Sequence, residues 1–382
     1  MSELRSLAVL NILSDPLIEA FADRKDGDVN TRTHFLRLLY EQGAEENFAA
    51  YVADAVLTDD NAFSRACAGG KHISSYLWQA YIEDLKKVAN ALQFSDAALN
   101  LGEVPFPVAS WDEETAARLQ KYYADNGYGQ YLRYRAFRYE GGELCPVRAL
   151  SPVTLDDLKG YESEKKEVRG NFENFLAGLP YADMLLYGDR GTGKSSTVHA
   201  MINLFSDKKL RLVEIDKENI LTLPALKSML ASVPMKFVVF IDDFSLREND
   251  DRVSTLKAAL QGSMEGNVGN VMIVATSNRR HIVEENFATR MDSVHVGDSE
   301  EELLSLSDRF GITVLFASVN KQNYLSIVHA IAEEMKITTP AETLDLLAER
   351  WAILRGGRSP RRARQFVDYI YACEQKGVSV EV

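Results

Sequence analysis

The sequence is poor in cysteine and has no long hydrophobic stretch. Its three cysteines, Cys67, Cys145 and Cys373, lie far apart and are odd in number, which predicts neither a disulfide framework nor a zinc site. No apolar run approaches the ~18–20 residues of a membrane helix. The first residues include early acidic side chains and no cleavage-site pattern. We therefore expect a cytoplasmic protein with no membrane partner.

Basic residues are also in deficit. Lys and Arg number 43 against 56 Asp and Glu, a formal net charge of −13. This balance argues against a chain built as a whole to wrap nucleic acid, although a local basic patch could still bind it. Internal repeats and low-complexity segments are missing too. The 382 residues, 46% of them hydrophobic, are enough for two or three domains with real cores.

The clearest motif is a glycine-rich stretch after a short apolar run at 184–187. It fits the phosphate-loop (Walker A) pattern G-x-x-x-x-G-K-[ST], whose glycines let backbone N–H groups curl around a phosphate. The matching residues are Gly188, Asp189, Arg190, Gly191, Thr192, Gly193, Lys194 and Ser195. An ordinary glycine-rich turn is the alternative, but the strand before it and the helical pattern after it favour a nucleotide site.

The phosphate loop assigns roles to its last residues. Lys194 is expected to reach the β- and γ-phosphates of ATP, and the Ser195 hydroxyl is expected to bind Mg²⁺. A helix that opens with Ser195 and Ser196 points its positive end at the anion. ATP and Mg²⁺ are therefore the expected cofactors.

A second buried strand ends in two carboxylates. The apolar run Phe237 to Ile241 leads into Asp242 and Asp243, the pattern of a parallel strand covered on both faces. A nucleotide hydrolase of this type needs an acid there to hold Mg²⁺ (Walker B), which we assign to Asp242. Asp243 follows as the base that orients the attacking water. The alternative is that the pair only caps a following helix.

A third apolar strand, 271–275, runs into Thr276, Ser277 and Asn278. Asn278 is the best candidate to hydrogen-bond the water or the γ-phosphate, with Thr276 behind it. Strand-like runs from Leu210 and from Ile312 bring the count to five, alternating with helical stretches. The pattern predicts an α/β fold: a doubly wound, five-stranded parallel sheet flanked by helices, with ligand at the carboxyl ends of the strands.

This order of motifs resembles the AAA+ ATPase superfamily over about residues 151–382. The resemblance implies an arginine finger in the segment "LLSLSDRFGITV", which places Arg309 near the γ-phosphate of a neighbouring subunit, where a planar guanidinium suits phosphate oxygens. The alternative for Arg309 is a surface ion pair. The segment "RGGRSPRRARQF" is similar to the sensor-2 motif of a helical lid, in which Arg361, and after it Arg364, is expected to reach the nucleotide of its own subunit.

The motifs together are most similar to a bacterial AAA+ family catalogued as domain-of-unknown-function family 815. In such modules the entry segment passes over the adenine, which implies that Gly160 and Tyr161 lie near the base. One departure is Asp243, where the wider superfamily carries Glu. Its carboxylate is one methylene shorter, which predicts slow turnover.

Three domains are expected. Residues 1–150 form a mainly helical N-terminal domain, because segments 33–57 and 73–94 place apolar residues at helical spacing. It carries a β-hairpin near 136–148, where Gly141 and Gly142 form a turn. The interleaved tyrosines and arginines there favour a packed strand pair over a nucleic-acid surface. Residues 151–319 form the AAA+ core, and residues 320–382 form the helical lid.

Two classes of function stay open. The first is a homo-oligomeric ATPase that binds ATP between subunits and remodels or assembles an unknown protein client. The second is a slow ATP-dependent switch or loader; Arg279, Arg280 and His281 leave nucleic acid open as its partner, though not favoured. The segment 216–230 has no aromatic pore loop, which argues against polypeptide threading. A small-molecule kinase is a third, weaker alternative, because it has no use for a finger arginine.

Overall fold

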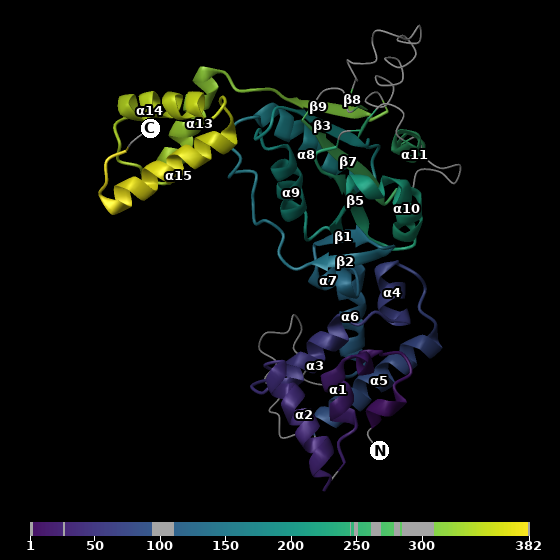
Figure 1. Cartoon of the computed structure of the whole chain (residues 1–382). Helices are drawn as coiled ribbons and strands as arrows, with labels where there is room; N and C mark the ends of the chain where they lie inside the picture. Colours follow the sequence, from purple (N-terminus) through teal and green to yellow (C-terminus); the bar gives the residue numbers. More distant parts are fainter. Residues whose placement is uncertain are drawn as a thin grey trace. The chain divides into compact units, whose positions relative to one another are not determined.

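The computed structural model describes residues 3–25, 27–93, 111–244, 246–247, 251–260, 269–278, 283–284 and 309–380 (Figure 1). They form two compact units. The first comprises Met1–Arg135 with the short segments Asp207–Lys209 and Val233–Met235. The second comprises Ala136–Ser206, Leu210–Ser232 and Lys236–Val382.

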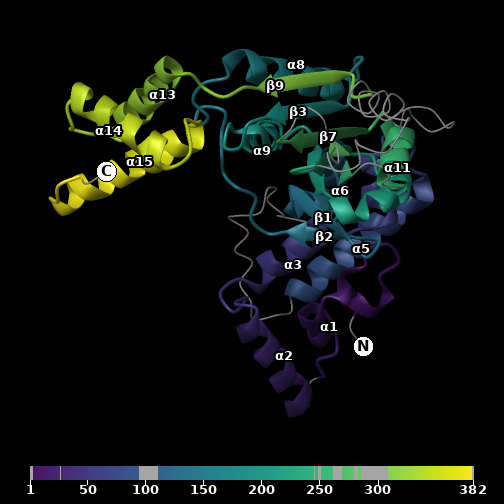
Figure 2. The same cartoon turned by 45° about the horizontal axis from the view of Figure 1, so that its top comes forward.

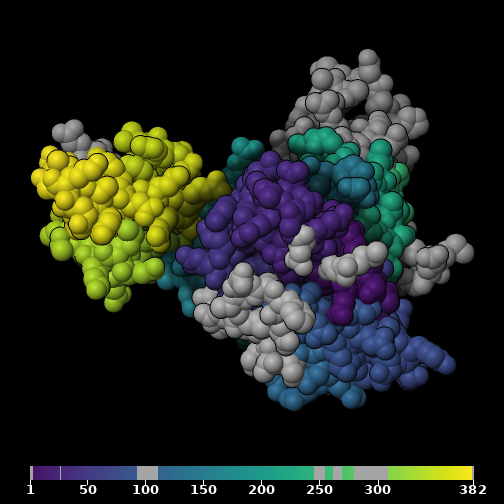
Figure 3. All heavy atoms as spheres, turned by 90° about the horizontal axis from the view of Figure 1, so that it is seen from below, coloured from purple at the N-terminus to yellow at the C-terminus, as the bar shows by residue number. Residues whose placement is uncertain are grey.

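The first unit is built from helices within its described residues. Its α-helices are α1 (Pro16–Ala22), α2 (Val29–Glu41), α3 (Phe48–Leu57), α4 (Ala62–Ala68), α5 (Ser75–Gln93), α6 (Glu113–Asn126) and α7 (Gln130–Arg133), after two 3-10 helices, η1 (Glu3–Ser6) and η2 (Ile12–Ser14). Figure 3 shows this unit, in purple to blue, as a packed surface. The expected helical N-terminal region is confirmed. No helix among the described residues is long and apolar enough to cross a membrane.

A buried carboxylate ties the start of the chain to helix α5. The side chain of Asp84 is fully buried and accepts hydrogen bonds from the backbone N–H groups of Ala8, Val9 and Leu10 at 2.6–3.0 Å. These bonds satisfy a charge that would otherwise be costly to bury. Asp84 is therefore explained by folding and is not a site candidate.

The second unit carries the sheet. Its strands are β1 (Ala136–Glu140), β2 (Glu143–Val147), β3 (Met184–Gly188), β4 (Leu210–Glu214), β5 (Lys236–Ile241), β6 (Leu246–Arg247), β7 (Val271–Ser277), β8 (Val283–Glu284) and β9 (Ile312–Phe316). Its helices are α8 (Glu162–Ala177), α9 (Lys194–Leu204), η3 (Lys217–Thr222), α10 (Leu223–Ala231), α11 (Asp251–Leu260), α13 (Lys321–Glu334), α14 (Ala341–Leu354) and α15 (Pro360–Lys376).

The main sheet has seven strands in the order β2-β1-β4-β5-β7-β3-β9, and β6 pairs with β8 separately. The five predicted strands are β3, β4, β5, β7 and β9, and all of their pairings are parallel. Strand β7 lies between β5 and β3, so the carboxyl ends of these three strands meet at one edge. The α/β class and the parallel sheet are confirmed.

Helices cover both faces of this sheet (Figures 1 and 2). On one face, apolar residues of α8 and α9 pack with alternate strand residues such as Val238 and Phe240. The intervening residues of β5, among them Val239, are buried as well, on the side of α10 and α11. Burial on both faces explains why β5 and β7 read as continuous apolar runs.

The hairpin differs from its expected place. Strands β1 and β2 do form an antiparallel pair around Gly141 and Gly142, as predicted. However, β1 pairs in parallel with β4, Ala136 opposite Leu212, so the hairpin extends the sheet of the second unit to seven strands. The five predicted parallel strands are therefore joined by the two strands of the hairpin, which the prediction placed in the N-terminal domain. Without β1, strand β4 would be an exposed edge, and proteins cover such edges.

The last three helices have a core of their own. Tyr324 and Val328 of α13, Ala348 of α14 and Phe366 of α15 are fully buried in it. Helix α15 begins after Ser359, whose side chain accepts from the Arg362 N–H, and Pro360 occupies its first turn, a standard start signal. The expected C-terminal helical lid is therefore present.

The amino ends of three strands converge on Asp183. Its side chain accepts a hydrogen bond from the Ile273 N–H of β7 at 2.6 Å, and its carbonyl accepts from the Ile312 N–H of β9 at 3.3 Å. Burial raises the pKa of the Asp183 carboxyl to about 6, although the Ile273 N–H bond and Lys227 oppose this shift. Asp183 thus connects β3 to β7 and β9. Its carboxyl group holds a proton up to a higher pH than an exposed aspartate does.

Asp183 should make stability fall with rising pH. In the unfolded chain an aspartate titrates near pH 4, so between about pH 4 and pH 6 the folded state binds the extra proton and loses stability as pH rises. Asp183→Asn keeps an acceptor for Ile273 and should be more stable than the parent at pH 7, by about 1 kcal/mol or more. The difference should vanish below pH 4. Denaturant unfolding at pH 3.5–7 measures this, with the exposed Asp156→Asn as control; an unchanged pH slope in Asp183→Asn would contradict the assignment.

Candidate functional site

The phosphate loop connects β3 to α9, as its sequence predicts. Gly188 has φ of 136°, and a Cβ there would lie 2.0 Å from the carbonyl oxygen of Phe316 on β9, so no side chain fits. Gly193 has φ of 98° and precedes the first residue of α9, a backbone conformation that favours glycine. Thr192 closes the loop by donating its hydroxyl to the Asp189 carbonyl at 2.9 Å.

Lys194 is the buried cation of the loop. Its Nζ donates to the carbonyl oxygens of Gly188 and Asp189 at 2.8 Å each, and to Oδ1 of Asn278 at 3.2 Å. Burial lowers the pKa of Lys194, and the nearby carboxylates of Asp189, Asp243 and Asp242 oppose that shift. An ammonium held this way gains a stronger partner when a phosphate group enters.

Asp242 connects the start of helix α9 to the carboxyl end of strand β7. Its Oδ1 accepts from the Ser195 hydroxyl and from the Thr276 hydroxyl, each at 2.6 Å. Thr276 Oγ1 in turn accepts from the Asp243 N–H at 3.0 Å. Hydroxyl and carboxylate oxygens are the ligands that Mg²⁺ prefers. Ser195 and Asp242 therefore fit the expected metal-binding pair, and Thr276 holds Asp242 and Asp243 in place.

Asp243 and Asn278 meet across the carboxyl ends of β5 and β7. The Asn278 Nδ2 group donates to Oδ1 of Asp243. Asp243 has φ of 46°, a left-handed conformation that aspartate adopts more readily than most side chains. Asn278 thus connects Lys194 to Asp243 through its two amide atoms. The structure brings these three predicted residues together.

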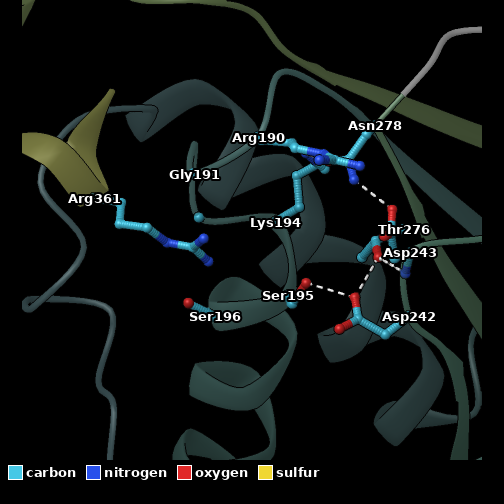
Figure 4. Close-up of a pocket in the computed structure, with 11 residues that line it drawn as sticks. Arg190, Gly191, Lys194, Ser195, Ser196, Asp242, Asp243, Thr276, Asn278 and Arg361 are labelled. Atoms are coloured by element: carbon cyan, nitrogen blue, oxygen red, sulfur yellow. Dashed lines mark hydrogen bonds between the residues drawn. The ribbon is translucent and has the colours of Figure 1, made fainter. Parts of the chain in front are cut away.

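These side chains line one cavity of about 370 Å³ (Figure 4). Three of its lining residues are cations and two are carboxylates, an arrangement that suits a polyphosphate with a divalent metal ion. Figure 4 shows Arg361 and Arg190 approaching from different sides, with Lys194 between them. The lining residues are Arg190, Gly191, Gly193, Lys194, Ser195, Ser196, Asp242, Asp243, Thr276, Asn278 and Arg361. We call this the phosphate cavity.

A second cavity, of about 460 Å³, shares Gly191, Gly193, Ser196 and Arg361 with the first. We call it the apolar cavity, since much of its lining is aliphatic or proline: Pro152, Val153, Leu158, Ile327, Ile331 and Pro360. A cavity of this size and character next to a phosphate site suits a planar base. The sequence did not predict these residues as part of a site, because Ile327 and Ile331 have the spacing of ordinary core positions in a helix.

Tyr161 lies apart from both cavities. Neither lining includes it among the described residues. Its hydroxyl donates to the carbonyl oxygen of Ala317, and its ring centre lies 5.2 Å from that of Phe316. Tyr161 thus packs over the end of β9, while Leu158 and Lys159, just before it, line the apolar cavity.

Arg361 is held near the loop by its backbone as well. Its N–H donates to the Gly191 carbonyl at 3.2 Å, which joins the start of α15 to the phosphate loop. Arg364 lines only the apolar cavity and pairs with Asp368 at 3.0 Å. Of the two sensor-2 candidates, Arg361 is therefore the one placed at the phosphate cavity.

Arg309 lies three residues before β9 begins at Ile312. The far end of this strand, Phe316, pairs with Gly188 at the phosphate loop, so roughly 13 Å of strand separates the two ends at ~3.3 Å per residue. Arg309 does not line the phosphate cavity formed by the described residues. The rest of its segment, 303–308, and Arg279, Arg280 and His281 lie outside the described residues.

Comparison with known proteins gives matches of three kinds. A family model described as "Protein of unknown function (DUF815)" matches residues 132–374. An AAA-ATPase of Arabidopsis thaliana is 31% identical over 118 residues, 28% of this chain and 22% of that protein, so the chain spans about a fifth of its length. The Holliday junction branch migration motor RuvB of Thermotoga maritima aligns with a TM-score of 0.41 at 18% identity, over 60% of this chain and 68% of that one.

The Thr276 hydroxyl gives a test of this geometry. Thr276→Val keeps the side-chain shape but leaves Asp242 and the Asp243 N–H without their shared partner, which costs about 1–3 kcal/mol of stability. We expect ATP hydrolysis to fall at least about tenfold and to need more Mg²⁺ for half-maximal rate. Thr276→Ser, which keeps the hydroxyl, is the matched control. Equal rates and equal Mg²⁺ dependence in both variants would show that the Thr276 hydroxyl has no role in hydrolysis.

Proposed function

The chain belongs to the DUF815 family and carries a P-loop of the AAA+ ATPase type, and from this premise we propose that it binds and hydrolyses ATP with Mg²⁺. One observation carries the proposal: Lys194, Ser195, Asp242 and Asn278 line a single cavity at the carboxyl ends of β3, β5 and β7. Each has the chemistry that one part of a metal–triphosphate requires. The adjoining apolar cavity has the lining that a purine needs.

The chemical step follows from these residues. Mg²⁺, when bound with the nucleotide, neutralises charge on the β- and γ-phosphates. Ser195 and Asp242 would hold it, and Lys194 would exchange its bonds to loop carbonyls for phosphate oxygens. Asp243 and Asn278 would orient the attacking water, with Asp243 as its proton acceptor. Since Asn278 already bonds both Lys194 and Asp243, nucleotide binding would change all three contacts together.

We propose that the active site is completed between subunits of a homo-oligomer. Arg309 precedes β9, at the end of that strand away from the phosphate loop of its own chain, which supports a role at a neighbour's γ-phosphate. The work done by hydrolysis would then be remodelling or assembly of a macromolecular client, a protein in the favoured version. Cytoplasmic localisation belongs to the same proposal.

A slow switch is the second candidate. The observation that favours it is Asp243: its carboxylate is short, and its Oδ1 is held by Asn278. With its base held in this way, the enzyme would hydrolyse ATP slowly until a partner frees Asp243 from Asn278. In this version ATP binding assembles a complex, on protein or nucleic acid, and hydrolysis only resets it.

The first experiment is steady-state ATP hydrolysis with Mg²⁺ over a wide range of protein concentration. Lys194→Ala, which removes the counter-charge of the phosphates, is the blank. Activity per chain that rises with concentration and then levels off would support sites shared between subunits. Wild-type protein that binds ATP but turns it over no faster than the blank would favour the switch.

Mixed subunits test the role of Arg309. Arg309→Ala should bind ATP normally and lose most hydrolysis at saturating protein concentration, about 10³-fold for an arginine finger. Asp242→Ala should lose hydrolysis in its own pocket and still supply Arg309. Mixing the two inactive variants should therefore restore activity, measured as phosphate release. A mixture as inactive as its components would reject the trans arginine, and Arg309→Ala mixed with Lys194→Ala provides a second, independent pairing.

A further inference from the structure

We infer that Arg190 is a catalytic residue that contacts the γ-phosphoryl group of the nucleotide bound to its own chain. The sequence places it at a variable position of the phosphate loop, where the motif prescribes no side chain. It nevertheless lines the phosphate cavity together with Asp242, Asp243 and Asn278. This inference rests on the proposed function and assigns one of its residues a role in the chemical step.

The position of Arg190 along the loop sets which phosphate it meets. It directly follows Asp189, whose carbonyl oxygen lies 2.8 Å from Lys194 Nζ. That ammonium is also bonded to Asn278, which is bonded to Asp243. Arg190 therefore leaves the loop beside the residues that face the reacting end of the triphosphate. Figure 4 shows its side chain on the Asn278 side of the cavity.

The guanidinium of Arg190 is available for a ligand. Three arginines near the start of α15 are paired: Arg358 with Glu349 at 2.6 Å, Arg364 with Asp368, and Arg362 with the Gly356 and Gly357 carbonyls. Within the described part of the chain, no hydrogen bond or ion pair holds Arg190. All five of its N–H donors can then turn to phosphate oxygens, for which the planar fork is well suited.

Arg361 has a different place. It lines both cavities, and its backbone bonds Gly191, so it enters where the phosphate and apolar cavities join. Arg190 lines the phosphate cavity but not the apolar cavity. We therefore assign Arg361 to binding the nucleotide and Arg190 to the transferring group.

The step itself balances without a proton from Arg190. A water oxygen forms a bond to the γ-phosphorus, and the bond from that phosphorus to the β,γ-bridging oxygen breaks. The electron pair stays with the β-phosphate of ADP, and the water proton passes to Asp243. Negative charge shifts among the phosphate oxygens as this happens, and a guanidinium stays charged throughout.

Arg190 should be required for hydrolysis more than for binding. Arg190→Ala should lower kcat at saturating Mg·ATP by about 10²-fold and leave the affinity for a fluorescent ATP analogue within about threefold. The tighter binding of ADP in the presence of fluoroaluminate, a mimic of the transferring phosphoryl group, should be lost. Arg190→Lys should bind ATP normally but recover little of kcat, because it lacks the fork.

Dilution separates the two arginines. Arg190→Ala should lower the rate at every protein concentration, whereas Arg309→Ala should remove the increase with protein concentration and leave the rate in dilute protein unchanged. Arg169→Ala, which removes an exposed arginine paired with Glu173 on α8, is the matched control and should leave both unchanged. Circular dichroism and a thermal midpoint verify that each variant is folded.

Three results would overturn the inference. An unchanged kcat in Arg190→Ala rejects a catalytic role. An ATP affinity that falls as much as kcat/KM, with fluoroaluminate binding intact, makes Arg190 a ground-state phosphate contact. Wild-type protein that neither binds nor hydrolyses ATP better than Lys194→Ala rejects the proposed function and the inference together, whereas the first two results leave the proposed function standing.

Discussion

The site depends on the parallel pairing of β7 between β5 and β3. This pairing places Thr276 beside both Asp242 and the start of α9, so that two hydroxyls and a carboxylate meet at 2.6 Å. Parallel strands buried on both faces allow little sliding, since a shift by one residue would turn every core side chain to the opposite face. The register that fills the core is thus the same register that assembles the polar residues.

The polar residues satisfy one another in the structure. Lys194 has carbonyl and amide oxygens as partners, Asp242 has two hydroxyls, and Asp243 has the Asn278 amide. A buried ammonium without partners would cost several kcal/mol. Each of these polar groups therefore has an internal partner, and the oxygens of a phosphate group would compete with these bonds. Under the proposed function, such competition would link recognition of the nucleotide to rearrangement of the residues that act on it.

Much of the fold and of the site was predictable from local sequence. The apolar runs gave the five parallel strands, and the phosphate-loop motif led to Lys194 and Ser195, because these features are contained within a few neighbouring residues. The pairing of β1 with β4 could not be found this way, since it joins Ala136 to Leu212 across a long stretch of chain. The apolar cavity was also hidden, because Ile331 on α13 has the same spacing whether it faces a core or a ligand. The motif identified Arg190 only as a residue of the phosphate loop. Its catalytic role is inferred from the structure, where it is exposed, lies beside the residues of the phosphate cavity and has no side-chain partner among the described residues.

The left-handed backbone at Asp243 has a consequence for how this family could diverge. Glutamate, the residue of the wider superfamily, gains less from local hydrogen bonds in that conformation than aspartate does, and its longer side chain would have to find another place than the one beside Asn278. A single exchange of Asp243 for glutamate therefore fits this backbone poorly. The turn after β5 and the residue after β7 would need to change with it, because the shorter acid, the left-handed backbone and the amide fit one another.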